Sequence, residues 1–89
     1  MSTYETVIQV VDPIGLHARP ASQIVKAVKE SGLKVMIGRQ GEKLTQANSP
    51  LMLMALKIKT GETLTVSVEA DDEESAANVV AQIQDFLKG

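Results

Sequence analysis

Residues 62–70 read ETLTVSVEA, a stretch in which apolar and polar side chains alternate. Leu64, Val66 and Val68 share one parity, while hydroxyl and carboxylate side chains take the other, which is typical of a strand with one buried face. Such a strand needs an apolar layer on one side only. The stretch therefore favours a largely antiparallel sheet that is covered by helices on one face.

Three further strands are predicted along the chain. Residues 4–11 carry tyrosine, isoleucine and valine on one parity and glutamate and glutamine on the other. Residues 33–37 and 42–47 read as short strands. The glycine-bounded loop GRQG between them, residues 38–41, has the length expected for a hairpin.

Apolar residues at helical spacing predict three helices. The first has its apolar face between Ala21 and Val28 and stops at Gly32, a residue type favoured just after a helix. The second is short, residues 50–56. The third opens with the acids DDEE, where the helix dipole favours negative charge, and runs to Lys88. The resulting order, βαββαβα, predicts an α+β two-layer sandwich.

The composition indicates one small domain, residues 1–89, of ordinary globular type. The formal net charge is −2, and Arg19 and Arg39 lie far apart, so no basic stripe for nucleic acid is present. With no cysteine and one histidine, the chain offers no disulfide and no usual zinc site. We expect no metal and no cofactor. No apolar run approaches the roughly 18 residues that span a membrane, and we expect a cytoplasmic protein.

The octet GLHARPAS, residues 15–22, places the histidine beside the start of the first helix. Two helix starts are open: Pro20 as the first helical residue, or His17 as the cap with Pro20 inside the first turn. In both, free N–H groups and the positive end of the helix dipole near the imidazole favour an anion. They also favour the neutral, nucleophilic imidazole, and Arg19 adds a charge-assisted donor for phosphoryl oxygens.

This arrangement suits temporary covalent capture of a phosphoryl group better than hydrolysis. No second histidine, cysteine or evident general base lies nearby in the sequence, and no glycine-rich phosphate loop is present to hold a nucleotide. A histidine in a turn before a helix is also commonly a solvated or capping residue. Arg19 alone does not separate these two interpretations.

The octet resembles the active-site signature of HPr, the family of histidine-containing phosphocarriers of the bacterial phosphoenolpyruvate-dependent phosphotransferase system. A second segment, ANSPLMLMAL at residues 47–56, resembles the regulatory-serine region and interaction helix of that family. Length and element order are similar as well. The resemblance implies an open-faced β-sandwich, with a four-stranded antiparallel sheet and three helices on one face.

By matching positions, the resemblance implies that His17 is phosphorylated, at Nδ1, and that Arg19 and Pro20 are its active-site neighbours. Gly15 and Ala18 complete the turn. The donor would be enzyme I, after it has taken the group from phosphoenolpyruvate, and the acceptor a sugar-specific enzyme IIA. As a carrier with a phosphohistidine intermediate, the chain is expected to have no independent turnover of a small-molecule substrate.

Ser49 matches the position that HPr kinase phosphorylates in some family members, where the added charge weakens docking with enzyme I. A serine before a proline at a helix start is also an ordinary N-cap, worth about 1 kcal/mol. Asn48 and Pro50 depart from the hydrophobic and often basic neighbours of kinase-regulated members. Capping and regulation by HPr kinase/phosphorylase therefore both stay open.

The helix at residues 50–56 is apolar on all sides, so part of it is expected to face outward and part to fill the core. By the family arrangement, Leu51 and Met54 lie near His17 in a docking patch with adaptable methionine at its centre. The other members of this patch come from the first helix: Ala18, Ser22, Lys26 and Lys29.

Three other functions are compatible with these residues. A carrier of the nitrogen-related branch of the phosphotransferase system would use the same octet. A docking regulator controlled through Ser49 would act without transfer from His17. A ferredoxin-like ligand-binding domain unrelated to phosphotransfer would make His17 dispensable. Because a carrier presents one face to successive partners, we expect a monomer.

Overall fold

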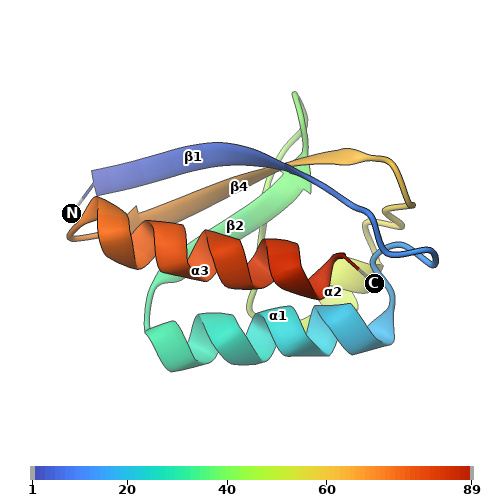
Figure 1. Cartoon of the computed structure of the whole chain (residues 1–89), viewed down its shortest axis with the longest axis horizontal. Coiled ribbons are helices and arrows are strands. Elements are labelled where there is room, and N and C mark those ends of the chain that lie inside the picture. Colours follow the sequence, from blue (N-terminus) through green and yellow to red (C-terminus); the bar gives the residue numbers. More distant parts are fainter. Residues whose placement is uncertain (1, 89) are drawn as a thin grey trace.

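The computed structural model describes residues 2–88, and it has the element order predicted from the sequence. The strands are β1 (Ser2–Gln9), β2 (Lys34–Arg39), β3 (Thr45–Gln46) and β4 (Thr63–Ala70), and the helices are α1 (Ala18–Ser31), α2 (Pro50–Met54) and α3 (Glu73–Phe86). The strands form one antiparallel sheet in the order β1-β4-β2-β3. The helices cover one face of this sheet and leave the other open (Figure 1). The predicted α+β, open-faced β-sandwich is confirmed.

The alternating stretch at residues 62–70 forms β4, a central strand of the sheet. All eight residues of β4 pair with β1, and β2 pairs on the other side. Leu64, Val66 and Val68 are fully buried, whereas the side chains between them are partly exposed. Burying one such side chain stabilises the fold by about 1.5–3 kcal/mol. A register slip of one residue would expose all three, so the alternation fixes the pairing.

The hairpin predicted over residues 33–47 differs from the observed structure. β2 continues through Gly38 and Arg39, which pair with β4, so half of the predicted loop is strand. β3 has two residues, although a strand is predicted over residues 42–47. A Cβ at Gly38 would lie 2.8 Å from the carbonyl oxygen of Lys43. Because Gly38 has no side chain, the backbone at Lys43 can pass close to β2. The segment therefore does not continue beside β2 as a longer strand.

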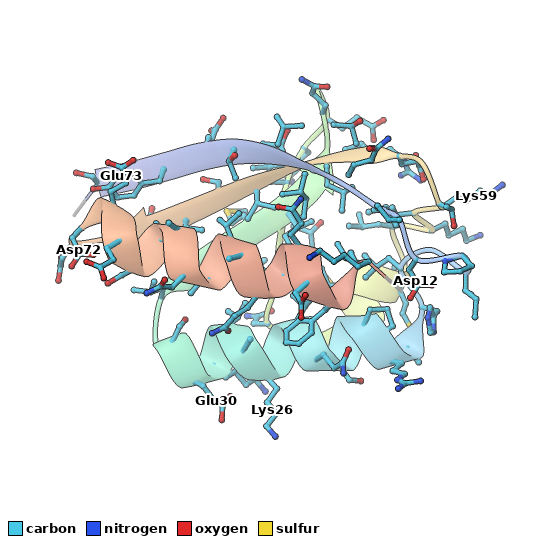
Figure 2. The ribbon with its side chains drawn as sticks, in the orientation of Figure 1. Asp12, Lys26, Glu30, Lys59, Asp72 and Glu73 are labelled. Carbon is cyan, nitrogen blue, oxygen red and sulfur yellow. The ribbon has the colours of Figure 1, made fainter. Side chains whose placement is uncertain are left out.

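The ends of the helices follow local chemistry. The N-cap of α3 is Asp72, whose carboxylate accepts the N–H of Ser75 at 2.7 Å, and Glu73 follows in the first turn (Figure 2). That N–H is the main reason why the pKa of Asp72 lies below its ordinary value. α2 ends before the predicted Leu56, because the N–H of Leu56 donates to a carbonyl three residues back and tightens the last turn.

The start of α1 and the end of α3 lie at the same end of the molecule (Figure 1). The turn that leads from β1 into α1 is at this end as well. Of the helices formed by residues 2–88, none is long and apolar enough to cross a membrane. The packing of these two helix ends determines where the octet sits.

Candidate functional site

The turn between β1 and α1 is held by contacts with two distant parts of the chain. The N–H of Asp12 donates to the carbonyl oxygen of Leu87, at the end of α3, across 2.6 Å. From the loop before β4, the carbonyl oxygen of Ile58 accepts the N–H of Leu16 at 3.0 Å. The hydroxyl of Thr60 in the same loop donates to the carbonyl oxygen of Asp12. The turn that leads into the octet is therefore held in place by hydrogen bonds from the middle and the end of the chain.

Gly15 can be replaced by no other residue without strain. Its φ is +89°, a conformation that side chains other than hydrogen rarely adopt. A Cβ there would also lie 2.6 Å from the carbonyl oxygen of Ile58. The glycine thus lets the turn approach the loop before β4, and its own carbonyl accepts the N–H of His17 at 3.1 Å.

His17 is the N-cap of α1. Its backbone is extended, with φ −104° and ψ −170°, and its carbonyl accepts the first helical N–H, that of Ala21, at 3.0 Å. Of the two helix starts left open by the sequence, the one with His17 as cap is observed. Pro20 lies in the first turn, where its missing N–H costs nothing because the first N–H groups of a helix have no intrahelical partner. The imidazole makes no capping hydrogen bond to α1.

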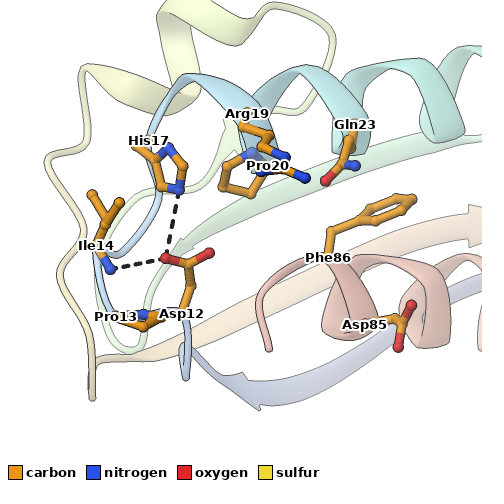
Figure 3. Close-up of a pocket in the computed structure, with 9 residues that line it drawn as sticks. All are labelled: Asp12, Pro13, Ile14, His17, Arg19, Pro20, Gln23, Asp85 and Phe86. Carbon is orange, nitrogen blue, oxygen red and sulfur yellow. Dashed lines mark hydrogen bonds and ion pairs between the residues drawn. The ribbon is translucent and has the colours of Figure 1, made fainter. Parts of the chain in front are cut away.

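The imidazole points instead toward a carboxylate that sequence reasoning missed (Figure 3). His17 Nε2 lies 3.5 Å from Asp12 Oδ1. The same oxygen accepts the N–H of Ile14 at 2.8 Å, which is the Asx turn expected of an aspartate at a chain reversal. That N–H is the main reason why the pKa of Asp12 lies below its ordinary value, and His17 adds to the effect. The available signal was the turn-forming sequence DPIG at residues 12–15, which overlaps the octet at Gly15.

A cavity of about 510 Å³ lies beside the imidazole (Figure 3). Arg19 and Pro20 contribute to its wall, as the octet would suggest. Gln23, one turn further along α1, contributes as well. The end of α3 supplies two more residues, Asp85 and the half-buried Phe86. These last three residues were not candidates from the sequence. The helical period alone places Gln23 beside Arg19, whereas only the packing of α1 against α3 brings Asp85 and Phe86 to the octet.

Arg19 is exposed on the first turn of α1, and it forms no ion pair with any residue in the part of the chain described here. Its guanidinium is therefore available to an anion in the cavity. Residues 2–88 contain no cluster of three or more histidine, cysteine or acidic side chains that could hold a metal ion. The chemistry that the site offers is that of an imidazole, a carboxylate and a guanidinium.

None of the residues expected to form the docking patch lines the cavity, and all of them except Met54 are exposed on α1 or α2. Leu51 is 75% exposed, whereas Met54 is partly buried against the core. α2 packs against α1, which connects the two parts of the patch. Figure 2 shows Lys26 extending away from the sheet into solvent. The exposed members on α1 are Ala18, Ser22, Lys26 and Lys29.

Ser49 occupies the N-cap position of α2, with φ −146° and ψ 125°, and Pro50 follows as the first helical residue. The predicted position is correct. The hydroxyl, however, makes no capping hydrogen bond, so the stabilisation expected of a serine cap is missing here.

Comparison with known proteins agrees with this site. The family described as the PTS HPr component phosphorylation site matches residues 4–88. A phosphocarrier protein HPr of Lysinibacillus sphaericus is 38% identical over 74 residues, covering 83% of each chain. One from Borreliella burgdorferi is 34% identical over 84 residues and 94% of each chain. The crystal structure of a phosphocarrier protein HPr from Bacillus anthracis superposes with a TM-score of 0.78 at 30% identity, over 94% of this chain and 100% of the other.

The matched residues include the turn, the whole of α1 and the end of α3 that together build the cavity beside His17. The fold and the element order agree with that assignment. This chain belongs to the HPr family, the phosphocarrier proteins of the phosphotransferase system.

Proposed function

We propose that this protein accepts a phosphoryl group on His17 from phosphorylated enzyme I and passes it to an enzyme IIA, acting in the cytoplasm as a monomeric domain of residues 1–89. The observation that carries the proposal is the position of the imidazole. His17 occupies the N-cap position of a 14-residue helix, and its side chain is 29% exposed beside an open cavity. A partner can therefore reach the ring without a change in the backbone conformation.

The transfer step uses the lone pair of Nδ1, the nitrogen that does not face Asp12. This pair attacks phosphorus, a P–N bond forms, and the bond from phosphorus to the leaving atom of the donor breaks, so that the donor keeps the electron pair. The phosphoryl oxygens lie where the first N–H groups of α1 have no intrahelical partner. Arg19, exposed on the same turn, supplies the positive charge. Onward transfer is the same step with the carrier as the donor.

Phosphoryl transfer from radiolabelled phosphoenolpyruvate, with purified enzyme I, tests the proposal. Wild-type protein should acquire an acid-labile label that His17→Ala lacks. His17 is the one histidine of the chain, so the variant leaves no other site for a phosphohistidine. Labelled carrier is then offered separately to a sugar-specific enzyme IIA and to its nitrogen-related counterpart, which identifies the branch. Wild-type protein that stays unlabelled with enzyme I of its own source would refute the proposal.

Ser49 supports a second candidate role as a regulatory phosphorylation site. Its hydroxyl is half-buried at the start of α2 and makes no capping bond, so its modification breaks no hydrogen bond of the cap. We expect HPr kinase/phosphorylase with ATP to add an acid-stable label to the wild type and none to Ser49→Ala. Equal labelling of the two proteins would exclude this site.

A further inference from the structure

Asp12 is the buried charged side chain of residues 2–88, with 8% of its surface exposed. Both backbone groups and the carboxylate are fixed. Its N–H donates to Leu87, its carbonyl oxygen accepts the hydroxyl of Thr60, and Oδ1 accepts the N–H of Ile14. These bonds fix the orientation of the Asp12 carboxylate.

What it faces is Nε2 of His17, 3.5 Å from Oδ1. Figure 3 shows the ring edge directed at the carboxylate, with the other ring nitrogen on the far side. The other charged groups that line the cavity are Arg19, from α1, and Asp85, from α3. Neither of them forms an ion pair with the imidazole. Asp12 is therefore the charged group that acts on the orientation of this ring.

Building on the proposed function, we propose that Asp12 is a positioning residue that keeps the proton of the neutral His17 imidazole on Nε2, so that the lone pair of Nδ1 is presented to the phosphoryl group.

The chemistry follows from the two tautomers of imidazole. A neutral ring carries its proton on one nitrogen and a lone pair on the other, and the hydrogen bond made by one nitrogen decides which form is present. An anionic acceptor beside Nε2 favours the Nε2–H form. Asp12 is ionised at neutral pH, as an ordinary aspartate is, and the N–H of Ile14 lowers its pKa further. The lone pair is then on Nδ1, which makes no bond to the helix.

Asp12 also matters after transfer. When Nδ1 has bonded to phosphorus, Nε2 keeps its proton and the ring carries positive charge 3.5 Å from the carboxylate oxygen. The carboxylate stabilises this charge, and a positively charged ring is the better leaving group when the P–N bond breaks toward the next acceptor. No proton has to leave or enter the protein in either direction.

Two substitutions separate this role from a purely structural one. Asp12→Asn keeps an oxygen for the N–H of Ile14 and so preserves the Asx turn, while it removes the negative charge. Asp12→Ala removes both. The matched control is Thr60→Val, which loses the hydroxyl bond to the carbonyl of Asp12 and leaves the carboxylate in place.

Nitrogen-15 NMR of the His17 ring in the unphosphorylated full chain, above the pH at which the ring is charged, reads the tautomer directly. We expect the Nε2–H form in the wild type and in Thr60→Val, a substantial Nδ1–H fraction in Asp12→Ala, and a smaller one in Asp12→Asn, whose amide oxygen is a weaker acceptor than the carboxylate. Identical tautomer populations in the wild type and both Asp12 variants would overturn the proposal.

The kinetic measurement is transfer from phosphoenolpyruvate through enzyme I. Asp12→Asn should lower kcat for phosphoryl acceptance about tenfold and leave the KM for the carrier unchanged, because the negative charge that favours the Nε2–H tautomer and stabilises the phosphorylated ring is gone while the docking surface is intact. A tautomer change without a loss of kcat would contradict the positioning role. If wild-type His17 took no label at all, the proposed function would fail, and the NMR measurement would still decide whether Asp12 orients the ring.

Discussion

The N–H of Leu16 donates to the carbonyl oxygen of Ile58, and that same oxygen lies 2.6 Å from the place where a Cβ of residue 15 would stand. One carbonyl therefore both anchors the turn that precedes His17 and excludes any side chain at residue 15. The loop before β4 has no catalytic group of its own at this point. This loop affects the turn before His17 through the position of its own backbone at Ile58.

Substitution of Gly15 tests this close approach. Gly61 is the matched control, since it has the same φ of +89° and no atom within 4 Å of an added Cβ. Gly61→Ala should cost about 1–2 kcal/mol of unfolding free energy from backbone strain, and Gly15→Ala about 1–3 kcal/mol more from the clash. Urea unfolding of both variants measures the difference. Equal losses would show that the turn relaxes away from Ile58 freely.

The two N-caps should respond differently to removal of their side chains. Asp72 accepts the N–H of Ser75, so Asp72→Ala should lower the midpoint of urea unfolding. Ser49 makes no capping bond, and Ser49→Ala should stay within about 0.5 kcal/mol of the wild type. A clear loss of stability in Ser49→Ala would mean that its hydroxyl caps α2 in solution.

The ion pair of Arg39 and Glu62 makes stability depend on pH. Arg39 Nε donates to Glu62 Oε1 at 2.6 Å, which is the main reason why the pKa of Glu62 lies below its ordinary value of 4.5. A depressed carboxyl pKa contributes stability that is present above the unfolded value and lost as the pH falls through the folded value. Urea unfolding should therefore show a loss of stability from about pH 5 to pH 3 that is smaller in Glu62→Gln.

Arg39→Met provides the control for this pH dependence. In the Arg39→Met background, Glu62→Gln should change the loss of stability at acid pH little, because the guanidinium that lowers the pKa of Glu62 is gone. An unchanged effect of Glu62→Gln would mean that the N–H of Lys59, the second donor to this carboxylate, is the stronger cause.

Leu51 should matter for docking and little for folding. It is 75% exposed on α2, whereas Val7 is 50% exposed on β1, away from the helices. We expect Leu51→Glu to raise the KM for the carrier in transfer from enzyme I about tenfold, a loss of roughly 1.4 kcal/mol, and Val7→Glu to leave it unchanged. Thermal unfolding should be similar for both variants. Equal KM values for the two would remove Leu51 from the docking patch.

Features of the fold that depend on neighbours in sequence were predictable. The alternation in β4 and the position of Ser49 before Pro50 are local patterns, and the structure has both. β3 was overestimated because the crossing of the chain over Gly38 depends on packing between segments. The hydroxyl of Ser49 was expected to cap, but its bond depends on a side-chain geometry that residue type does not determine.

The same division holds for the site. The octet predicts a histidine at the start of a helix, and His17 is the N-cap of α1. Asp12 was missed because the turn that carries its carboxylate is anchored by Leu87, at the end of α3, and its carbonyl is bonded by Thr60, which is 48 residues away. Phe86 was missed for a similar reason, since only the packing of α3 against α1 brings it to the octet, whereas the helical period of α1 could have placed Gln23 beside Arg19. Long-range contacts of this kind leave no periodic signal in a sequence.

The backbone bonds that close the turn around His17 have a consequence for protein quality in the cell. Ile58 comes from the middle of the chain and Leu87 from its end, so a nascent chain that has emerged only as far as the octet lacks both anchors. Its histidine would be an ordinary imidazole in an unstructured segment. Under the proposed function, the capacity to accept a phosphoryl group would then arise only when the last helix packs, so unfinished chains would not take part in transfer.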